Sequence, residues 1–430
     1  MKINNFFLFF FHYNQKKQYS SKYQKKMIMI PTKDRIKKTK DIILHDAHEF
    51  DKEINNFKSI YTKKRELKIL KSGDNDITRV FVDFDKLLFP YLCKSLKTTS
   101  HVTNITFAYT YLDFMIIYQF AKVLAVNTSI KIICMENQII YDRGALLMAI
   151  ALKNNSTVET INMKNISIYP YGFNCISEAL CTNSSIKNLD MSDNGYMFPT
   201  KDYEYELKFT ETLKLNSTIE SINFSGCRIS DINMYMLSEG LKYNSTIKNI
   251  ILHHNKIGDD GFIEFARKLR TNSSIQKLNF CNNNIGDRGL IELSEALISN
   301  PSININDLDI SYNKITNESM FKLRDALWVN TSIKKIDITH NCINYKGIDI
   351  IVDVLITNRT IECFYFANSP FQSLENKSGE KLVKILENNF SLKKMMNDEC
   401  GIDYYTRDTL KALLKRNYDF SKQQQQIDSI

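Results

Sequence analysis

One short motif recurs through most of the chain at a nearly constant interval. It reads Asn-Ser/Thr-Ser/Thr followed by a β-branched residue, and in its clearest copies the branched residue is Ile130, Val158, Ile186, Ile219, Ile247, Ile275 or Ile333. Weaker copies have their anchor at Ile77, Val102, Ile305, Ile361 and Leu392. The commonest interval between anchors is 28 residues, as from Ile247 to Ile275. A period of this length sustained over about twelve units predicts a solenoid, in which each unit buries its apolar face against its neighbours.

The copy that runs from Ser274 to Asn300 shows what one unit contains. Leu278 and Phe280 alternate with polar residues, which is the spacing of a β-strand. Leu290, Leu293 and Leu297 follow at steps of three and four, which is one face of an α-helix. Each unit is therefore expected to contribute one strand and one helix, and the fold class is α/β.

These residues resemble the leucine-rich repeat, in its long ribonuclease-inhibitor-like class. The family pattern L-x-x-L-x-L-x-x-N is met by residues 247–255, 275–283 and 333–341. The resemblance implies a horseshoe with parallel strands on the concave face and helices on the convex face. It also implies a structural ladder at the Asn position, where Cys is an accepted alternate, and this ladder consists of Asn194, Cys227, Asn255, Asn283, Asn313 and Asn341. Ile166 occupies the same position and predicts an irregular ladder there.

The repeats set the domain boundaries. The leucine-rich repeat domain of about twelve units is expected over residues 77–418. Residues 41–76 carry apolar residues at helical spacing and predict a helical N-terminal cap, because a solenoid needs its first open edge covered. Residues 1–40 predict a basic, disordered tail, and residues 419–430 a disordered Gln-rich tail.

The formal net charge of +9 suggests a nucleic-acid or membrane partner until it is divided along the chain. Residues 1–40 hold 11 Lys and Arg against one acid, a net of +10. The remainder has 57 − 11 = 46 bases and 48 − 1 = 47 acids, a net of −1. The repeat domain is thus almost neutral, so we expect no nucleic-acid partner and membrane contact only through the N-terminal tail.

Alternate strand residues are expected to point into the concavity, where a partner would bind. The face they form is polar and mixed in sign. A monomer that binds a protein partner there, without catalysis, is the leading functional hypothesis, since most proteins of this repeat class bind proteins. The expected contact residues are Lys164, Asp190, Asn223, His253, Lys277, Asn279, Asp309, Tyr312, Asp337 and Tyr365.

The residues give little support for catalysis, a cofactor or a metal. No Gly-rich phosphate loop or Ser/His/Asp set is visible, and Asp259 and Asp260 fall where carboxylates favour the start of a helix. His253 and His340 belong to strands three units apart, too distant to share an ion. The nine widely spaced cysteines predict free thiols.

The alternative function is regulation of a small GTPase, as by Ran GTPase-activating proteins, which use the same repeat class. No catalytic residue can be carried over, because Arg143 occupies the same repeat position as Arg288 and fits ordinary repeat chemistry. A cytoplasmic location is expected. Secretion is the minor alternative, since Asn-x-Ser/Thr sites and a Phe-rich start would suit it; turn chemistry is the preferred explanation of those sites.

Overall fold

The computed structural model describes residues 79–82, 89–107, 112–199, 207–366, 376–395 and 403–428. All of these belong to one compact unit of the chain, and the fold given below is that of this unit. The basic tail predicted for residues 1–40 and the cap predicted for residues 41–76 lie outside the described residues.

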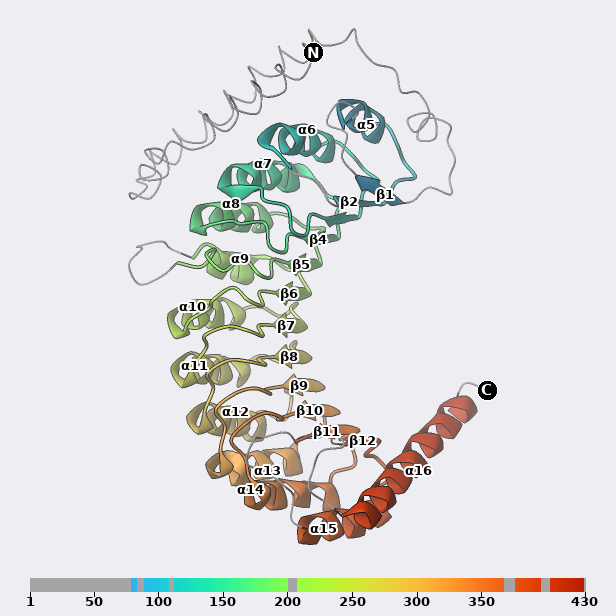
Figure 1. The fold of residues 1–430 in the computed structure, drawn as a ribbon. Helices are drawn as coiled ribbons and strands as arrows, with labels where there is room; N and C mark the ends of the chain where they lie inside the picture. Colours follow the sequence, from blue (N-terminus) through green and yellow to red (C-terminus); the bar gives the residue numbers. More distant parts are fainter. Residues whose placement is uncertain are drawn as a thin grey trace, which may run out of the picture. The chain divides into compact units, whose positions relative to one another are not determined.

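Twelve strands form a single parallel sheet in chain order, one after each predicted anchor (Figure 1). They are β1 (Arg79–Val82), β2 (Asn104–Phe107), β3 (Ile132–Cys134), β4 (Thr160–Asn162), β5 (Asn188–Asp190), β6 (Ser221–Asn223), β7 (Asn249–Ile251), β8 (Lys277–Asn279), β9 (Asp307–Asp309), β10 (Lys335–Asp337), β11 (Cys363–Tyr365) and β12 (Lys394–Met395). Equivalent residues pair in register, as Leu278 of β8 does with Ile250 of β7. The predicted parallel arrangement is confirmed.

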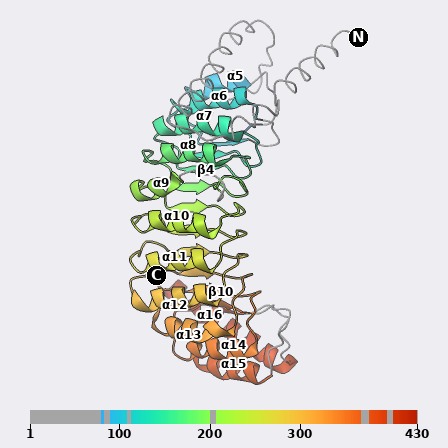
Figure 2. The ribbon, with the colours of Figure 1, turned by 90° about the vertical axis from the view of Figure 1, so that its left-hand side faces the viewer.

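Helices follow the strands and, except for the last one, lie together on the convex side, whereas the last helix runs from the C-terminal end of the stack towards the strand side (Figures 1 and 2). They are α5 (Phe89–Leu96), α6 (Phe114–Leu124), α7 (Tyr141–Asn154), α8 (Pro170–Leu180), α9 (Phe209–Leu215), α10 (Asp231–Leu241), α11 (Asp259–Leu269), α12 (Asp287–Ser299), η1 (Asn317–Ser319), α13 (Met320–Val329), α14 (Tyr345–Ile351), η2 (Val352–Ile356), α15 (Asn376–Asn388) and α16 (Tyr404–Asp428). The core lies between the two layers, where Leu278, Phe280, Leu290 and Leu293 are all at most 1% exposed. The predicted horseshoe is thus confirmed.

The predicted strand-turn ladder forms by hydrogen bonds between units. The Asn283 amide donates to the Leu252 carbonyl of the preceding unit, and its oxygen accepts from the Ile257 amide of that unit. Asn194, Asn255, Asn313 and Asn341 act in the same way. The Cys227 thiol contacts the Met191 carbonyl at 3.3 Å and so takes the place of the amide donor. At Ile166 the side chain has no donor, and only its backbone N–H joins the ladder, through Asn194.

A second ladder runs along the ends of the helices, and we call it the helix-end ladder. Asn244 is typical: its amide donates to the carbonyls of Leu213 and Asn216 in the preceding unit, and its oxygen accepts from Thr246 and Ile247. The ladder residues are Asn127, Asn155, Asn183, Asn216, Asn244, Asn272, Asn300, Asn330, Asn358 and Asn389. These are the asparagines of the recurring motif, so turn chemistry explains the motif as predicted.

The acidic residue that begins a helix caps the helix of the following unit. Asp259, the first residue of α11, accepts hydrogen bonds from the Gly286 and Gly289 amides at 2.8 and 2.9 Å at the start of α12. Asp231 does the same for Gly258 and Gly261. The prediction that Asp259 serves a helix N-terminus is therefore correct, but the helix it caps is the neighbour's.

Asp142 makes the equivalent contact from α7 to Tyr169, and there burial raises the pKa of the carboxyl to about 6 while the Tyr169 and Gly172 amides oppose the rise. The folded chain therefore binds this proton more tightly than the unfolded chain, and between about pH 4 and 6 the free energy of unfolding falls as pH rises.

The substitution Asp142→Asn keeps the oxygen that accepts the backbone hydrogen bond, as Asn317 does for Asn344. We expect the variant to lose part of that pH dependence and to gain Tm at pH 7, in thermal melts from pH 4 to 7. An unchanged slope would refute this.

An aromatic cluster fills the core where the period lengthens between β5 and β6. Phe224 meets the rings of Phe173, Phe198 and Phe209 at centroid distances of 5.7, 5.6 and 5.0 Å. Phe198 belongs to the extra residues of this unit and is 4% exposed. The first part of the insertion therefore contributes the Phe198 ring to the core. Residues 200–206 lie outside the described residues.

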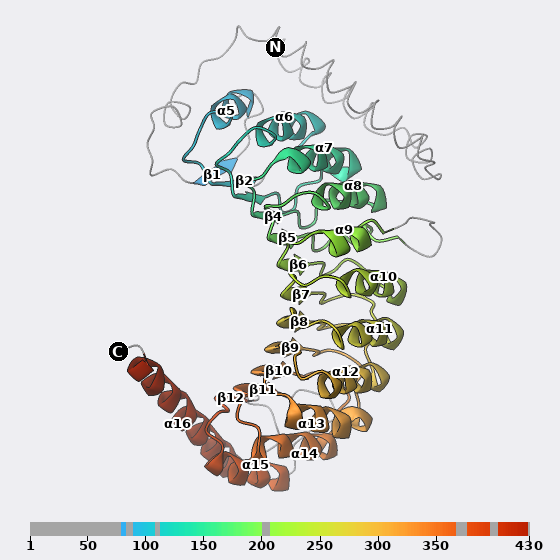
Figure 3. The same ribbon diagram turned by 180° about the vertical axis from the view of Figure 1, so that it is seen from behind.

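The C-terminal end differs from the prediction. Disorder was expected over residues 419–430, but α16 continues to Asp428 (Figure 3). Asp403 caps its start, and Asn417 extends the helix-end ladder by donating to the Asn389 and Leu392 carbonyls. The glutamines that follow are good helix formers, and no Gly or Pro interrupts them, so the helix propagates once docked.

Candidate functional site: the concave sheet face

The concave face is built from the first and last residues of the three-residue strands, because the middle residue points into the core. In β10, for example, Ile336 is buried while Lys335 and Asp337 are partly exposed. All ten predicted contact residues lie in these strands or in the turns that follow them. The alternation predicted from the sequence is confirmed. The side chains of the face differ, however, in whether they form ion pairs or hydrogen bonds with neighbouring residues.

A row of alternating charges borders the face just before the strands. Glu159 pairs with Lys131 at 3.5 Å and with Lys187 at 3.0 Å, and Glu220 pairs with Lys248 at 2.8 Å. Lys187 is the main cause of a lowered pKa of Glu159. Such exposed pairs stabilise the fold little individually, because solvent screens them. Their regular alternation leaves this border with no net basic stripe.

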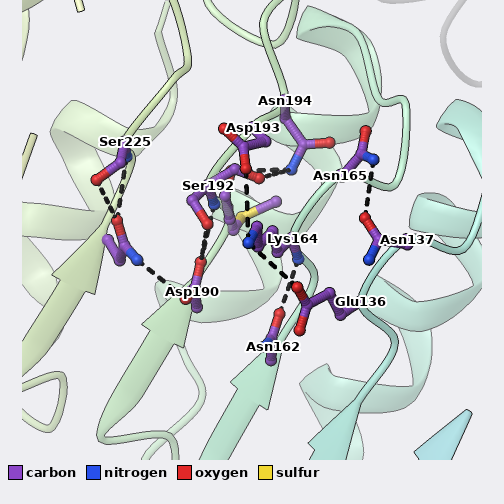
Figure 4. A network of polar contacts seen from close by, with 12 residues as sticks. Glu136, Asn137, Asn162, Lys164, Asn165, Asp190, Ser192, Asp193, Asn194 and Ser225 are labelled. Atoms are coloured by element: carbon purple, nitrogen blue, oxygen red, sulfur yellow. Dashed lines mark hydrogen bonds and ion pairs between the residues drawn. The ribbon is translucent and has the colours of Figure 1, made fainter. Parts of the chain in front are cut away.

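In the N-terminal part of the face, the polar side chains form ion pairs and hydrogen bonds with one another (Figure 4). Lys164 lies between Glu136, at 3.1 Å, and Asp193, at 3.7 Å, and so links three successive units. Asp190 accepts hydrogen bonds from the Ser192 hydroxyl and from the Asn223 amide. Three of the predicted contact residues are therefore committed to neighbours within the sheet.

Two further contacts between face residues occur in the C-terminal part, where the Asn279 amide donates to Asp309 at 3.2 Å and Lys335 pairs with Asp307 at 3.2 Å. Around them the face is more open. Lys277 is exposed and forms no ion pair among the described residues. Asp337 uses one carboxylate oxygen for the backbone and hydroxyl of Thr339. Its burial raises the pKa of the carboxyl.

His253 and Tyr365 are partly exposed on β7's following turn and on β11. Burial lowers the pKa of His253, and the neighbouring His254 adds to the effect. Burial raises the pKa of Tyr365 to about 12, so its hydroxyl is a hydrogen-bond donor at neutral pH. Both side chains therefore present neutral groups to the concavity.

The residue three positions after the last residue of the strand has a left-handed backbone in unit after unit. The row consists of Asn137, Asn165, Asp193, Gly226, His254, Asn282, Tyr312 and His340. Asn, Asp, His and Gly are common at positive φ, whereas a bulky aromatic residue is unusual there. Tyr312, at φ 53°, is the exception in this row.

Tyr312 stacks on His340 of the next unit, with ring centroids 3.9 Å apart and planes 16° from parallel. The Tyr312 side chain is nevertheless 50% exposed. His340 was absent from the predicted contact residues. The 28-residue interval between the two positions was the signal that could have placed these rings side by side.

Among the described residues, no group of three His, Cys, Asp or Glu side chains is placed to hold a metal. His253 and His340 follow β7 and β10, with β8 and β9 between them. Arg143 directly follows Asp142 in α7 and Arg288 directly follows Asp287 in α12, so the two arginines share a repeat position. The eight described cysteines are free. In the described part of the chain, no helix has the length and apolar character needed to cross a bilayer.

The family model described as "Leucine Rich repeat" matches residues 271–294, 302–323 and 329–349. This match places leucine-rich repeats in those three segments, and the other described units repeat the same strand and helix arrangement. The ribonuclease-inhibitor-like class stays a prediction. A search of curated proteins finds no match to the chain.

Two solved structures are similar. Actin-binding site 2 of leiomodin-1 is 24% identical, with a TM-score of 0.34, and the alignment covers 40% of this chain and 95% of that one. The tropomodulin C-terminal domain of Caenorhabditis elegans is 16% identical, with a TM-score of 0.24, over 50% of this chain and 95% of that one.

Proposed function

We propose that this protein is a non-catalytic scaffold that binds a protein partner through its concave face, mainly between β8 and β11. The partner-facing side chains are Lys277, Asp337, Tyr312 and Tyr365, with His340 behind Tyr312. The scaffold needs no cofactor and acts as a monomer in the cytoplasm. Buried motif asparagines support that location, because they cannot carry glycans in the folded chain.

The observation that carries this proposal is the conformation of Tyr312. A residue with a Cβ in the left-handed region costs about 1 kcal/mol, and Asn bears this cost better than Tyr. The stability of the fold therefore does not explain Tyr at this position. A half-exposed Tyr ring held rigid by stacking is, in contrast, the kind of side chain that anchors protein interfaces.

Tyr312→Asn separates the two roles. We expect Tm to stay the same or rise slightly, since Asn suits the backbone and the lost stacking offsets part of the gain. We expect binding of the partner to weaken about tenfold or more, as for an interface anchor. The measurement is quantitative affinity capture from the native cells with the full chain as bait, followed by titration of each captured protein.

Tyr243→Gln serves as the matched control. Tyr243 is 60% exposed but lies just after α10, on the helix side. It should leave capture unchanged. The proposal is wrong if every protein captured by the unmodified chain is captured equally by the Tyr312→Asn variant.

A further inference from the structure

The convex side carries an exposed apolar strip that the concave site does not use. Ile298, Trp328 and Ile356 are 38%, 46% and 54% exposed. Each lies two residues before the helix-end ladder asparagine of its unit, so the three occupy one equivalent position in successive units. Ile298 and Trp328 are the second-last residues of α12 and α13, and Ile356 is the last residue of η2. We call these three residues the convex strip.

The strip is specific to the C-terminal units. In three earlier units the same position holds Lys214, Lys242 and Arg270. A basic residue there keeps the convex surface solvated, as expected for a face without a partner. The change from charged to apolar residues at one repeat position is therefore a local property of units that contain α12 to η2.

Arginine and aromatic rings reinforce the strip at its centre. The Arg324 guanidinium lies 4.5 Å from the centroid of Trp328 and 5.1 Å from that of Phe321. Phe321 is itself 54% exposed. Trp and Arg are the residues most enriched among energetic anchors of protein interfaces, and stacking holds both in fixed positions before a partner arrives.

Lysines surround the C-terminal end of the strip. Ile356 lines a depression of about 340 Å³ together with Lys377, Lys381 and Lys384 of α15, and one acid, Glu380. Lys377 and Lys384 are exposed and form no ion pair among the described residues. This end of the strip consequently carries positive charge that its own neighbours leave unbalanced.

Lys381 differs from the other two, because it pairs with Asp353 at 2.7 Å and donates to the Asp349 carbonyl. It fixes α15 against the preceding unit and is not available to a ligand. Lys377 and Lys384, which form no ion pair among the described residues, share the depression with Ile356 and are the groups that would recognise an acid.

We infer that the convex strip binds an acidic amphipathic helix of a protein partner. Neighbouring helices of a solenoid lie about 10 Å apart, so the three anchors repeat at about that interval. A helix laid across them presents apolar residues seven positions apart every ~10.5 Å and on nearly the same side. Carboxylates at its end then meet Lys377 and Lys384. This interface is separate from the concave site and would allow two partners at once.

The test uses the full chain and a labelled 21-residue synthetic helix with leucines seven residues apart and glutamates at both ends. A second peptide carries lysines in place of the glutamates. We expect fluorescence anisotropy at low salt to show binding of the glutamate peptide about tenfold or more tighter than of the lysine peptide. The Trp328→Gln/Ile356→Gln variant should lose about tenfold or more in affinity.

Two further variants decide the assignment. Lys377→Glu/Lys384→Glu should reverse the preference between the peptides, which loss of folding alone cannot do. Leu215→Gln, which replaces an exposed residue at the end of α9, should change affinity less than about twofold. Equal affinity for both peptides, or equal loss in the Leu215 variant, overturns the inference. So does a dimer of the full chain in sedimentation equilibrium that Trp328→Gln dissociates, because the strip would then bind a second copy.

Discussion

We expect Asn244→Ala to lower the free energy of unfolding by about 3–5 kcal/mol. The alanine leaves the buried carbonyls of Leu213 and Asn216 without a donor and the amides of Thr246 and Ile247 without an acceptor. Each such buried group costs about 1–3 kcal/mol, and partial relaxation reduces the sum.

The loss falls at the boundary between units, so it also weakens the coupling that makes a solenoid unfold as a whole. Guanidinium denaturation followed by circular dichroism should show a lower midpoint and a broader or divided transition. Asn154→Ala is the matched control, because the Asn154 amide makes one exposed bond to the Ile150 carbonyl. A variant as stable as that control would show that the helix-end ladder contributes little.

Phe224→Ala should destabilise the fold by about 3–5 kcal/mol, as large core truncations do. Phe224 is fully buried and contacts three other rings, and the alanine leaves a cavity that these rigid neighbours fill poorly. The measurement is the free energy of unfolding from the same denaturation curves.

Two comparisons sharpen this expectation. Phe224→Leu should cost much less, about 1–2 kcal/mol, since most of the volume stays. Phe321→Ala removes an exposed ring and should stay within about 1 kcal/mol of the unmodified chain. If the Phe224→Ala loss is no larger than that of Phe321→Ala, the aromatic cluster does not stabilise the lengthened unit.

Most of the fold could be predicted from the sequence repeat. A period of 28 residues fixes the strand order and register, because each unit can only stack on the next, and the alternation around Leu278 fixes which residues face the concavity. The position of the predicted contact residues followed from this. The pattern did not predict which of these residues remain available to a partner. Ion pairs such as those of Lys164 with Glu136 and Asp193 depend on side-chain rotamers, which a sequence pattern does not specify.

Two features could not be predicted from the sequence, for different reasons. The left-handed backbone of Tyr312 belongs to the turn of every unit, but an aromatic residue gives no signal for positive φ. The C-terminal helix was missed because glutamines suit disordered chains and helices alike, and docking through Asn417 decides between them.

The helix-end ladder has a consequence for how the protein can be made. All of its asparagines except Asn300, which precedes a proline, stand in Asn-x-Ser/Thr sites, and oligosaccharyl transfer acts on chains before they fold. In a secretory expression host, a sugar added to Asn183 or Asn272 would occupy a place that is only 4% or 6% exposed in the finished molecule. Units bearing it could not stack. Recombinant protein should therefore be prepared in bacterial cytosol, and secreted preparations should accumulate as glycosylated, aggregated material.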